Sequence, residues 1–364
     1  MRGSILMTHV PLITIVLATY NRPASLRLAI RSVLRQTVSD WRLLVIGDAC
    51  DARTAEVVAA IGDSRIDYVN LPVRCGEQSI PNSIGMALAA SRWIALLNHD
   101  DVLLADHLEQ AMAALDAGGG EFFAGRAAFA RVSGHLDDGR LVPVFSEVTP
   151  SGRSLGDAFS RGCEMFEPCS AWVFSRDLAQ RVGPWRAAAS IYRTPMEDWL
   201  LRAWRAGARL VESGDITVLR LLTHYQQAGP QGAYAWDKGE DALLDDLIHK
   251  VSAGGIRYAV LRQIGSDLAA RVPRPGFSRL VLGLLGDLTE AQERRAGQLL
   301  TPSAAMEYLQ DGRDAFEQFC IEAGLEKGRT LRIALRMRTG EELPPCPDFA
   351  GLVRFARQSL DSRQ

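Results

Sequence analysis

Hydrophobic residues toward the amino end of the chain alternate between short continuous runs and helical spacing. Three runs are almost wholly apolar, as in strands buried on both faces of a sheet: Leu12–Leu17, Trp41–Gly47 and Trp93–Leu97. A shorter strand is predicted at Ile66–Val69, and helices are predicted at 23–34, 54–61 and 82–90. This alternation predicts an α/β fold with a mostly parallel central sheet and helices on its faces.

The pattern changes after the glycines at 118–120. A strand is predicted over Phe122–Val132, a hairpin turn at Asp138-Gly139 and a polar loop over 145–161. Further predictions are a strand at 170–174, a helix capped by Ser175, a helix at 200–206, strands at 210–211 and 216–222, and mainly helices from about Trp236 onward. We therefore divide the chain into a flexible lead (1–9), an α/β domain (10–235) and a mainly helical carboxy-terminal region (236–364).

Within the carboxy-terminal region, Arg329–Arg338 alternates apolar side chains with arginines, which predicts a strand with one basic face. A basic face of this kind is usually solvated. The alternative is a patch that binds acidic lipid or a polyanionic acceptor. The sequence predicts no other role for this region and no oligomeric state.

A polar cluster, Asn98-His99-Asp100-Asp101, follows the third apolar run. Ligands of open α/β sheets bind at the carboxyl ends of the strands, which is where this cluster is expected to lie. Two adjacent carboxylates suit a hard cation such as Mg²⁺ or Mn²⁺ that shares its ligands with substrate phosphates. The alternative is that His99–Asp101 begins a helix over Val102–Leu115.

Composition and charge exclude several classes of protein. The 364 residues include 41 Lys and Arg against 43 Asp and Glu, so a net charge of −2 gives no whole-chain attraction for nucleic acid. No Gly-x-Gly-x-x-Gly follows the first predicted strand, which argues against a dinucleotide-binding fold. The Gly-Lys-Ser/Thr loop of P-loop ATPases is also absent from the sequence.

Cysteine usage and hydropathy bear on location. Six cysteines are scattered without a Cys-x-x-Cys pair, which predicts free thiols in a reducing compartment rather than a zinc site or disulfides. No segment reaches the roughly 18 apolar residues of a membrane span. The apolar run near the amino end is short and no small-residue cleavage site follows it. We expect a soluble cytoplasmic protein, with peripheral contact at the inner face of the membrane as an alternative.

Six short motifs resemble, in order, those of the inverting family 2 glycosyltransferases, which have the GT-A fold. The motifs are Ile15–Arg22 with its Thr-Tyr-Asn-Arg turn, Ser32–Thr37, Val45–Cys50, Asn82–Gly85, Leu97–Asp101 and Glu197–Arg202. Each motif alone is weak, but their order over the α/β pattern of residues 10–225 is specific. The resemblance implies transfer of a sugar from a nucleotide-sugar to an acceptor hydroxyl, in the synthesis of a polysaccharide or glycoconjugate.

The resemblance also implies roles for individual residues. Asp101, with Asp100 and His224, would hold Mn²⁺ or Mg²⁺ against the diphosphate of the donor. Asp48 would accept a hydrogen bond from the base, which fits the uracil or thymine of a UDP- or dTDP-linked sugar. For Asp48 and His224 the alternatives are a strand-end turn and a histidine without a metal. The nucleotide pocket would further be lined by Thr19, Tyr20, Arg22, Asn82 and Asp100.

An inverting transfer needs one general base to take the proton of the acceptor hydroxyl. The resemblance assigns this role to Asp198, with Glu197 beside it, and a neighbouring acid raises the pKa of a base toward the working pH. The alternative is that both acids only stabilise the first turn of a helix. The acceptor is expected to be a glycan, a lipid-linked compound or a small hydroxyl compound.

Three positions depart from the usual family pattern. Gly47 and Asn98 replace acids, and Pro81 replaces a common arginine. One rival hypothesis is therefore a catalytically weak relative that binds a nucleotide-sugar or glycan, or serves as a scaffold. Another is a nucleotidyltransferase, which would need a basic glycine-rich loop after the first strand, and Ala18–Arg22 does not supply one.

Overall fold

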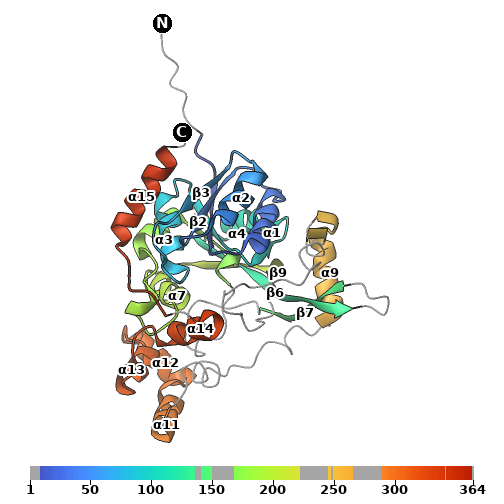
Figure 1. Cartoon of the computed structure of the whole chain (residues 1–364). Coiled ribbons are helices and arrows are strands. Elements are labelled where there is room, and N and C mark those ends of the chain that lie inside the picture. The colour runs from blue at the N-terminus through green and yellow to red at the C-terminus, as the bar shows by residue number, and fades with distance from the viewer. Residues whose placement is uncertain are drawn as a thin grey trace.

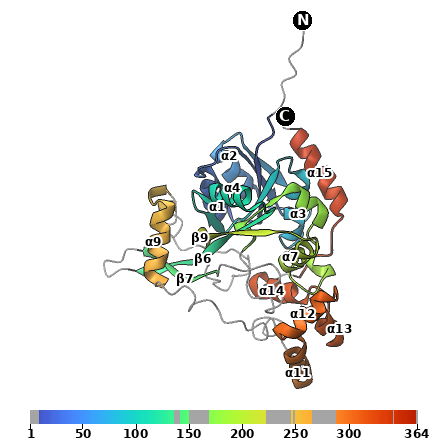
Figure 2. The same ribbon diagram turned by 180° about the vertical axis from the view of Figure 1, so that it is seen from behind.

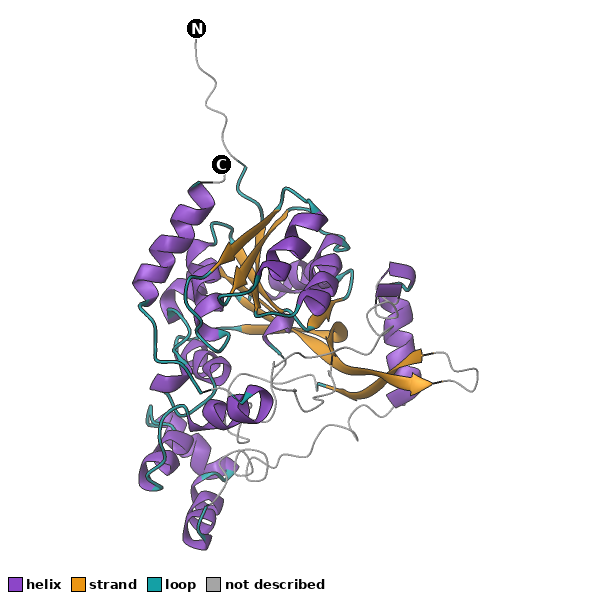
Figure 3. Ribbon diagram, in the orientation of Figure 1, coloured by secondary structure: helices purple, strands orange, loops and turns teal. Residues whose placement is uncertain are grey.

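The computed structural model of this chain describes residues 9–135, 141–149, 168–221, 245–246, 249–264, 288–340 and 342–362. One sheet, in the order β3-β2-β1-β4-β8-β6-β9-β5, runs through the α/β part, and β7 pairs with β6. Helices lie on both faces of this sheet (Figures 1 and 3).

The first half of the sheet is parallel, as predicted. It consists of β1 (Ile13–Thr19), β2 (Trp41–Gly47), β3 (Ile66–Asn70) and β4 (Trp93–Asn98). Thr19 lies opposite Gly47, and Ala18 lies opposite Asn98, so the carboxyl ends of β1, β2 and β4 meet at one edge. The polar residues that follow these strands therefore share one side of the molecule.

The connecting helices also follow the pattern of the sequence. They are α1 (Pro23–Leu34), α2 (Ala52–Ile61), α3 (Ser79–Leu88) and α4 (His107–Gly118). Helix α1 begins with Pro23, whose fixed φ suits a first helical position, and buries Leu26, Ile30 and Val33 against the sheet. Asp51 caps α2 by accepting a hydrogen bond from the backbone N–H of Arg53.

The second half of the sheet is mixed. It contains β5 (Asp101–Leu103), β6 (Phe122–His135), β7 (Leu141–Val148), β8 (Trp172–Ser175) and β9 (Leu210–Leu221). Strand β8 is antiparallel to both β4 and β6, whereas β9 is parallel to β6 and antiparallel to β5. The long strand β6 thus lies between β8, which borders the parallel half, and β9, which pairs with β5.

Three local predictions are corrected in this half. Asp101 begins strand β5 and α4 starts only at His107, so the helix-start interpretation of His99–Asp101 is wrong. The polar loop predicted from 145 is wrong for 145–148, which belong to β7 and pair with β6. The strands predicted at 210–211 and 216–222 form one continuous strand through Leu221. Positions 136–140, with the predicted hairpin turn, and 150–167 lie outside the described residues.

The described part of the carboxy-terminal region is helical, as predicted. After α6 (Arg176–Val182) and α7 (Pro195–Arg205) of the α/β part come α9 (Ala253–Ile264), α11 (Glu290–Leu299), α12 (Pro302–Gln310), α13 (Ala315–Glu322), α14 (Arg329–Thr339) and α15 (Phe349–Asp361). Helix α15 lies along α3 and contacts β3, which both views of the ribbon show (Figures 1 and 2).

Helix α14 corrects the strand predicted over Arg329–Arg338. Glycines in the left-handed region bound it at both ends, Gly328 with φ 74° and Gly340 with φ 70°. Between them the long unbranched side chains favour a helix, in which Arg332 and Arg336 stand four residues apart. Arg332 pairs with Glu326 and Arg336 with Glu342, so these charges are partly neutralised within the chain.

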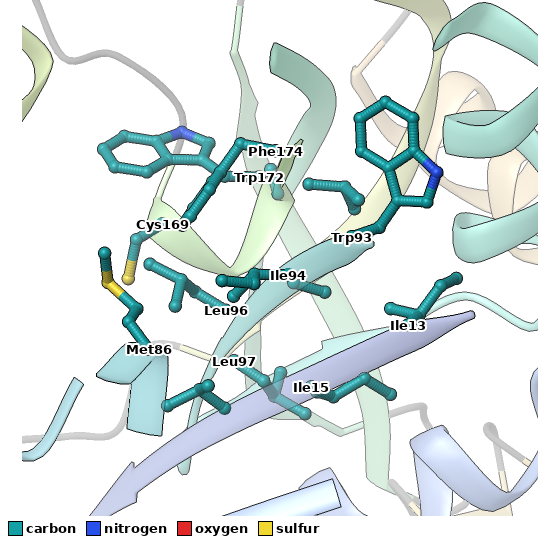
Figure 4. Packing of buried hydrophobic residues seen from close by; sticks show 14 of the residues in the cluster. Ile13, Ile15, Met86, Trp93, Ile94, Leu96, Leu97, Cys169, Trp172 and Phe174 are labelled. Atoms are coloured by element: carbon teal, nitrogen blue, oxygen red, sulfur yellow. The ribbon is translucent and has the colours of Figure 1, made fainter. Parts of the chain in front are cut away.

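Aromatic side chains fill the core between α7 and the strands β6 and β8. Trp172, Trp185 and Trp199 are buried, and the ring centroid of Trp199 lies 4.9 Å from that of Phe174. Figure 4 shows Ile94 and Leu96 on the same side of β4 as Trp172 and Phe174. This cluster fixes α7 against β8, which determines where Asp198 lies.

Among the described residues, no helix is both long and apolar enough to cross a bilayer. The cysteines that the structure describes are free thiols, as predicted: Cys50, Cys75, Cys169, Cys320 and Cys346. Cys163 lies outside the described residues.

We predict that the buried His107, at the start of α4, makes the folded state less stable in acid. Its Nδ1 lies 2.9 Å from Thr217 Oγ1, and its Nε2 has no hydrogen-bond partner within the described part of the chain. Burial lowers the pKa of His107 to about 4, against an ordinary value of about 6.5 in an unfolded chain. The histidine contribution to stability is therefore complete above pH 6.5 and is lost as the pH falls from 6.5 toward 4.

The expected loss from this one group between pH 7 and pH 5 is about 2 kcal/mol in the free energy of unfolding. Urea denaturation at both pH values measures it. His107→Gln should reduce the difference between the two pH values. An equal pH dependence in the His107 variant and the wild-type chain would contradict the assignment.

Candidate active site

The turn after β1 carries three of the predicted pocket residues. Thr19 ends the strand, Tyr20 follows, and Arg22 precedes α1. Asn21 between them has φ 44°, and its side-chain oxygen accepts a hydrogen bond from the N–H of Asp51, 2.8 Å away. Asparagine tolerates this left-handed conformation better than most residues, which explains its place in the motif.

Asp48 holds the loop that follows β3. The carboxylate is buried, and its two oxygens accept hydrogen bonds from the backbone N–H of Cys75 (2.6 Å) and Gly76 (2.9 Å). Burial raises the pKa of Asp48, and these hydrogen bonds oppose the rise. Asp48 is therefore more than a strand-end turn residue, because it fixes a backbone segment 27 residues further along the chain.

The same loop contributes Arg74, which sequence reasoning missed. Its guanidinium carbon lies 3.8 Å from the ring centroid of Tyr20, a cation–π contact. The contact joins the turn after β1 to the loop after β3 beside Asp48. The sequence signal was only a basic residue in a loop, which is too common to interpret.

The polar cluster after β4 is joined to the turn after β1. Arg22 donates a hydrogen bond to Asp100 at 2.9 Å, and the N–H of Tyr20 donates to Nδ1 of His99 at 3.3 Å. Burial opposes ionisation of Asp100, but the nearby His99 and Arg22 outweigh it and lower the pKa of Asp100. Asp100 is thus an ionised carboxylate held by an arginine.

Asp101 is the most buried acid of the cluster, 2% exposed. Its Oδ2 accepts hydrogen bonds from the amide of Asn98 (3.0 Å) and the hydroxyl of Ser170 (2.5 Å). Burial and the negative charge of Asp100 raise the pKa of Asp101 to about 7. Asn98, where the family pattern has an acid, therefore supports Asp101 instead of adding a third negative charge.

Ser170 was missed by sequence reasoning. It lies in the short 3₁₀ helix Cys169–Ala171, and its oxygen also accepts a hydrogen bond from the N–H of Asn98, 2.9 Å away. The adjacent thiol of Cys169 donates to the side-chain oxygen of Asn98 at 3.3 Å. This arrangement depends on β8 pairing with β4, which the residue pattern alone does not reveal.

Arg220 is a further basic residue beside the acids. Strand β9 places it opposite Asp101, and its positive charge favours ionisation of both Asp100 and Asp101. It stacks over Phe129, with its guanidinium carbon 5.2 Å from the ring centroid. The residue pattern predicts a strand at this position, but it does not indicate that β9 pairs with β5.

The acids after β4 form only part of a metal site. In the portion of the chain that the structure describes, no group of three or more His, Cys, Asp and Glu side chains is arranged to hold a metal ion. Two neighbouring carboxylates nevertheless fit Mg²⁺ or Mn²⁺ when phosphate oxygens complete the coordination shell. The raised pKa of Asp101 supports the fit, because a cation would relieve its repulsion from Asp100. His224, the third predicted ligand, lies outside the described residues.

Two atoms of predicted site residues are buried without a hydrogen-bond partner inside the described ranges. They are the hydroxyl oxygen of Thr19 and the side-chain nitrogen of Asn82, which lies in the first turn of α3. Buried polar atoms usually have partners, so each orphaned atom calls for an explanation. A ligand or water at this edge of the sheet would supply the missing partner.

The predicted base lies in the first turn of α7. Asp198 is 8% exposed, and its carboxylate accepts a hydrogen bond from Arg202 at 2.9 Å and from Arg186 at 3.4 Å. Arg202 also donates to the carbonyl oxygens of Val182 and Pro184, which fixes it in place. Arg186 is different, because 58% of its side chain is exposed.

Glu197 stabilises the start of the same helix. Its carboxylate accepts a hydrogen bond from the N–H of Thr194, while the hydroxyl of Thr194 accepts one from the N–H of Glu197. This capping box is the helix-start alternative that the sequence left open. The structure thus places Glu197 in the cap, next in sequence to Asp198 but bonded to Thr194.

Comparison with known proteins agrees with this geometry. The family model described as glycosyl transferase family 2 matches residues 14–183. Among curated proteins, the succinoglycan biosynthesis protein ExoO of Rhizobium meliloti (strain 1021) is 32% identical over 138 residues, which cover 38% of each chain. The Escherichia coli UDP-Glc:alpha-D-GlcNAc-diphosphoundecaprenol beta-1,3-glucosyltransferase WfgD is 34% identical over 98 residues, 27% of this chain and 38% of that protein.

The matched segments span little more than a third of the length of these curated relatives. Among solved structures, residues 1–349 of S. aureus TarS align with a TM-score of 0.48 and 14% identity, over 90% of this chain and 92% of that one. The family match covers β1 to β4, the polar cluster after β4 and Ser170. Residues 14–183 of this chain therefore match glycosyl transferase family 2, and they span the parallel half of the sheet together with the polar cluster that follows β4.

Proposed function

We propose that this chain is an inverting, metal-dependent glycosyltransferase that moves a sugar from a nucleotide-sugar to an acceptor hydroxyl. The observation that carries the proposal is the meeting of Asp48, Asp100 and Asp101 with Arg22 and Arg74 at one edge of the sheet. Asp48 would bind the nucleobase, and the pair Asp100 and Asp101 would bind a cation. The nearby arginines would contact the diphosphate, so the set matches the parts of a nucleoside diphosphate.

The donor is proposed to be a UDP- or dTDP-linked sugar. Each oxygen of Asp48 accepts one backbone hydrogen bond and retains a lone pair, so the carboxylate has room to accept the N–H of uracil or thymine. Thr19 and the Tyr20–Arg74 contact would line the pocket beside this base, and the orphaned nitrogen of Asn82 would find a partner there.

Mn²⁺ or Mg²⁺ would be held by Asp101 and Asp100, and, by resemblance, by His224. When bound, the cation would neutralise the charge of the departing diphosphate. Arg22 and Arg220 supply positive charge from the protein itself on either side of the acid pair. Asn98 and Ser170 orient Asp101 and leave its second oxygen for a ligand.

Asp198 is the proposed general base. Inversion requires a single displacement, in which Asp198 accepts the proton of the acceptor hydroxyl as its oxygen attacks the anomeric carbon. Arg202 fixes one carboxylate oxygen, and the longer 3.4 Å contact from the exposed Arg186 leaves the other open to exchange for an acceptor. The resemblance gives Glu197 a place beside this base, and we propose that it acts by fixing the turn.

The acceptor is proposed to be a glycan or a lipid-linked sugar in polysaccharide synthesis. This follows from the names of the matched relatives, one a succinoglycan biosynthesis protein and one a glucosyltransferase acting on a diphosphoundecaprenol-linked sugar. A cytoplasmic location with contact at the inner face of the membrane belongs to the same proposal.

A second candidate is a nucleotide-sugar- or glycan-binding protein without transfer activity. The observation that favours it is the double contact of Asp198 with Arg186 and Arg202, because both arginines occupy carboxylate oxygens that an acceptor hydroxyl would need. The two functions share the nucleotide pocket and differ only at α7.

A donor screen separates these functions. Purified protein would be incubated with Mn²⁺ and a panel of UDP- and dTDP-sugars, with and without lipid-linked and oligosaccharide acceptors, and nucleotide release would be measured. We expect one donor to release nucleotide in an acceptor-dependent way. Tight nucleotide binding with no release from any pair would favour the second function, and absence of binding would contradict both.

A further inference from the structure

A short proline-rich segment between α14 and α15 lies directly on the loop that Asp48 holds. We call residues Leu343–Pro347 the proline segment. A Cβ atom added to Gly76 would lie only 2.5 Å from Cδ of Pro344 and 2.9 Å from its Cγ. Gly76 also has φ 78°, a conformation that favours glycine. Two independent constraints, the close proline ring and the backbone, therefore require glycine at position 76.

The Cys75–Gly76 peptide connects Pro344 to Asp48. The N–H of Gly76 donates to Oδ2 of Asp48, and the N–H of Cys75 donates to Oδ1. The ring of Pro344 occupies the space that a Cβ on Gly76 would need. Moving the proline ring away would free the two N–H groups to turn from the carboxylate, because no side chain on Gly76 holds the peptide in place.

The proline segment and the loop also enclose a small cavity. Its walls come from Cys75, Glu77 and Ile80 on one side, from Ala187–Ala189 on a second and from the proline segment on a third. Glu77 bridges the first two walls, since its carboxylate accepts hydrogen bonds from the N–H of Ser79 (2.7 Å) and of Ala188 (3.3 Å). The proline segment is thus part of the packing around this loop.

Both ends of the proline segment are anchored. On the amino side, Gly328 of the α14 cap donates its N–H to the carbonyl oxygen of Ile191 at 2.7 Å, and Leu343 packs near Gly328. On the carboxyl side, α15 buries Leu352 and Ala356 in the cluster that includes Ile80 of α3. Prolines restrict the backbone between these anchors, so the segment has little freedom to withdraw.

We propose that Pro344 is a positioning residue for the nucleotide base, acting through Gly76 and Asp48. The ring of Pro344 holds the Cys75–Gly76 peptide in place against Asp48 and thereby fixes the carboxylate for the base. This gives the region beyond α14, for which the sequence suggested no role, a function in donor affinity. The inference rests on the proposed function, because it assumes that Asp48 accepts a hydrogen bond from the nucleobase of the donor.

Pro344→Gly tests the inference, with Pro345→Gly as the matched control. Both changes add the same backbone freedom, but Pro345 is exposed and the side-chain atoms nearest Gly76 belong to Pro344 and Leu335. We expect Pro344→Gly to raise the Kd for UDP in Mn²⁺ and the donor KM about five- to tenfold, with kcat and acceptor KM within twofold of wild type. Pro345→Gly should match the wild-type chain, and Pro344→Ala should fall between them.

Amide hydrogen exchange tests the effect of Pro344 on the loop without any bound donor. The amides of Cys75 and Gly76 should exchange faster in Pro344→Gly than in Pro345→Gly, while those of the β1 strand exchange at the same rate in both. Equal UDP affinity and equal exchange at Cys75 and Gly76 in the two variants would overturn the inference. If the wild-type chain binds no UDP, the proposed function fails, and unequal exchange would still establish that Pro344 fixes the loop.

Discussion

Replacing Asp198 with asparagine is expected to slow sugar transfer by two to four orders of magnitude, the range usually contributed by a general base. Asparagine keeps the shape of the side chain and can still accept a hydrogen bond from Arg202, but it takes no proton at working pH. Binding of the nucleotide should be unchanged, because the residues proposed to contact it lie outside α7.

Glu197→Gln is the matched control for this prediction. Glutamine can maintain a capping box, as Gln292 does with Thr289 at the start of α11, so the first turn of α7 should persist. We expect transfer within a few-fold of wild type in this variant. Nucleotide release measured at saturating donor and acceptor compares the two variants. Transfer by Asp198→Asn at a rate near wild type would place the base elsewhere.

The thermal midpoint of Asp198→Asn distinguishes catalysis from structure. Asp198 is buried with Arg202, and removal of its charge leaves that guanidinium without an anion. A lower midpoint with a normal Kd for UDP would indicate a local effect in α7. Loss of transfer together with loss of UDP binding would show instead that the fold is disturbed.

The parallel half of the sheet could be predicted because β1, β2 and β4 are buried on both faces. Runs such as Ile13–Thr19 and Trp93–Asn98 admit few other structures, and the helices between them carry clear apolar spacing and capping residues. The polar motifs follow these strands directly, so predicting the strands also placed Asp48, Asp100 and Asp101 at one edge.

The mixed half was harder to predict because its contacts join segments far apart in the sequence. The sequence predicted two separate strands within β9, and the pairing of β9 with β5, which brings Arg220 opposite Asp101, is not encoded in local periodicity. Ser170 reaches Asp101 only because β8 runs antiparallel beside β4. Helix α14 was predicted as a strand since alternating Leu and Arg fit both periods, and its glycine caps decided the outcome.

The contacts that hold Asp48 in place also could not be predicted from the sequence. Gly76 lies in the loop after β3, and its partner Pro344 lies more than 260 residues away in the sequence. A glycine required by close packing leaves no periodic signal. The same holds for Arg186, whose contact with Asp198 depends on the position of α7 against the tryptophan cluster.

Asp101→Asn is expected to remove the effect of a divalent cation on nucleotide binding. Asparagine can still accept the hydrogen bonds of Asn98 and Ser170, so the end of β4 and the start of β5 should keep their geometry. The variant lacks the negative charge that a hard cation needs beside Asp100. Asp63→Asn is the matched control, because Asp63 pairs with Arg65 on a loop away from the polar cluster.

The central claim is that the acids after β2 and β4 bind a nucleoside diphosphate together with a divalent cation. Calorimetric titration of UDP into the wild-type chain and Asp101→Asn, each with Mn²⁺ and with EDTA, tests it most directly. We predict that Mn²⁺ tightens binding to the wild-type chain and to Asp63→Asn at least tenfold, about 1.4 kcal/mol, and leaves Asp101→Asn unchanged. Absence of UDP binding by the wild-type chain, or an undiminished Mn²⁺ effect in Asp101→Asn, would contradict the claim.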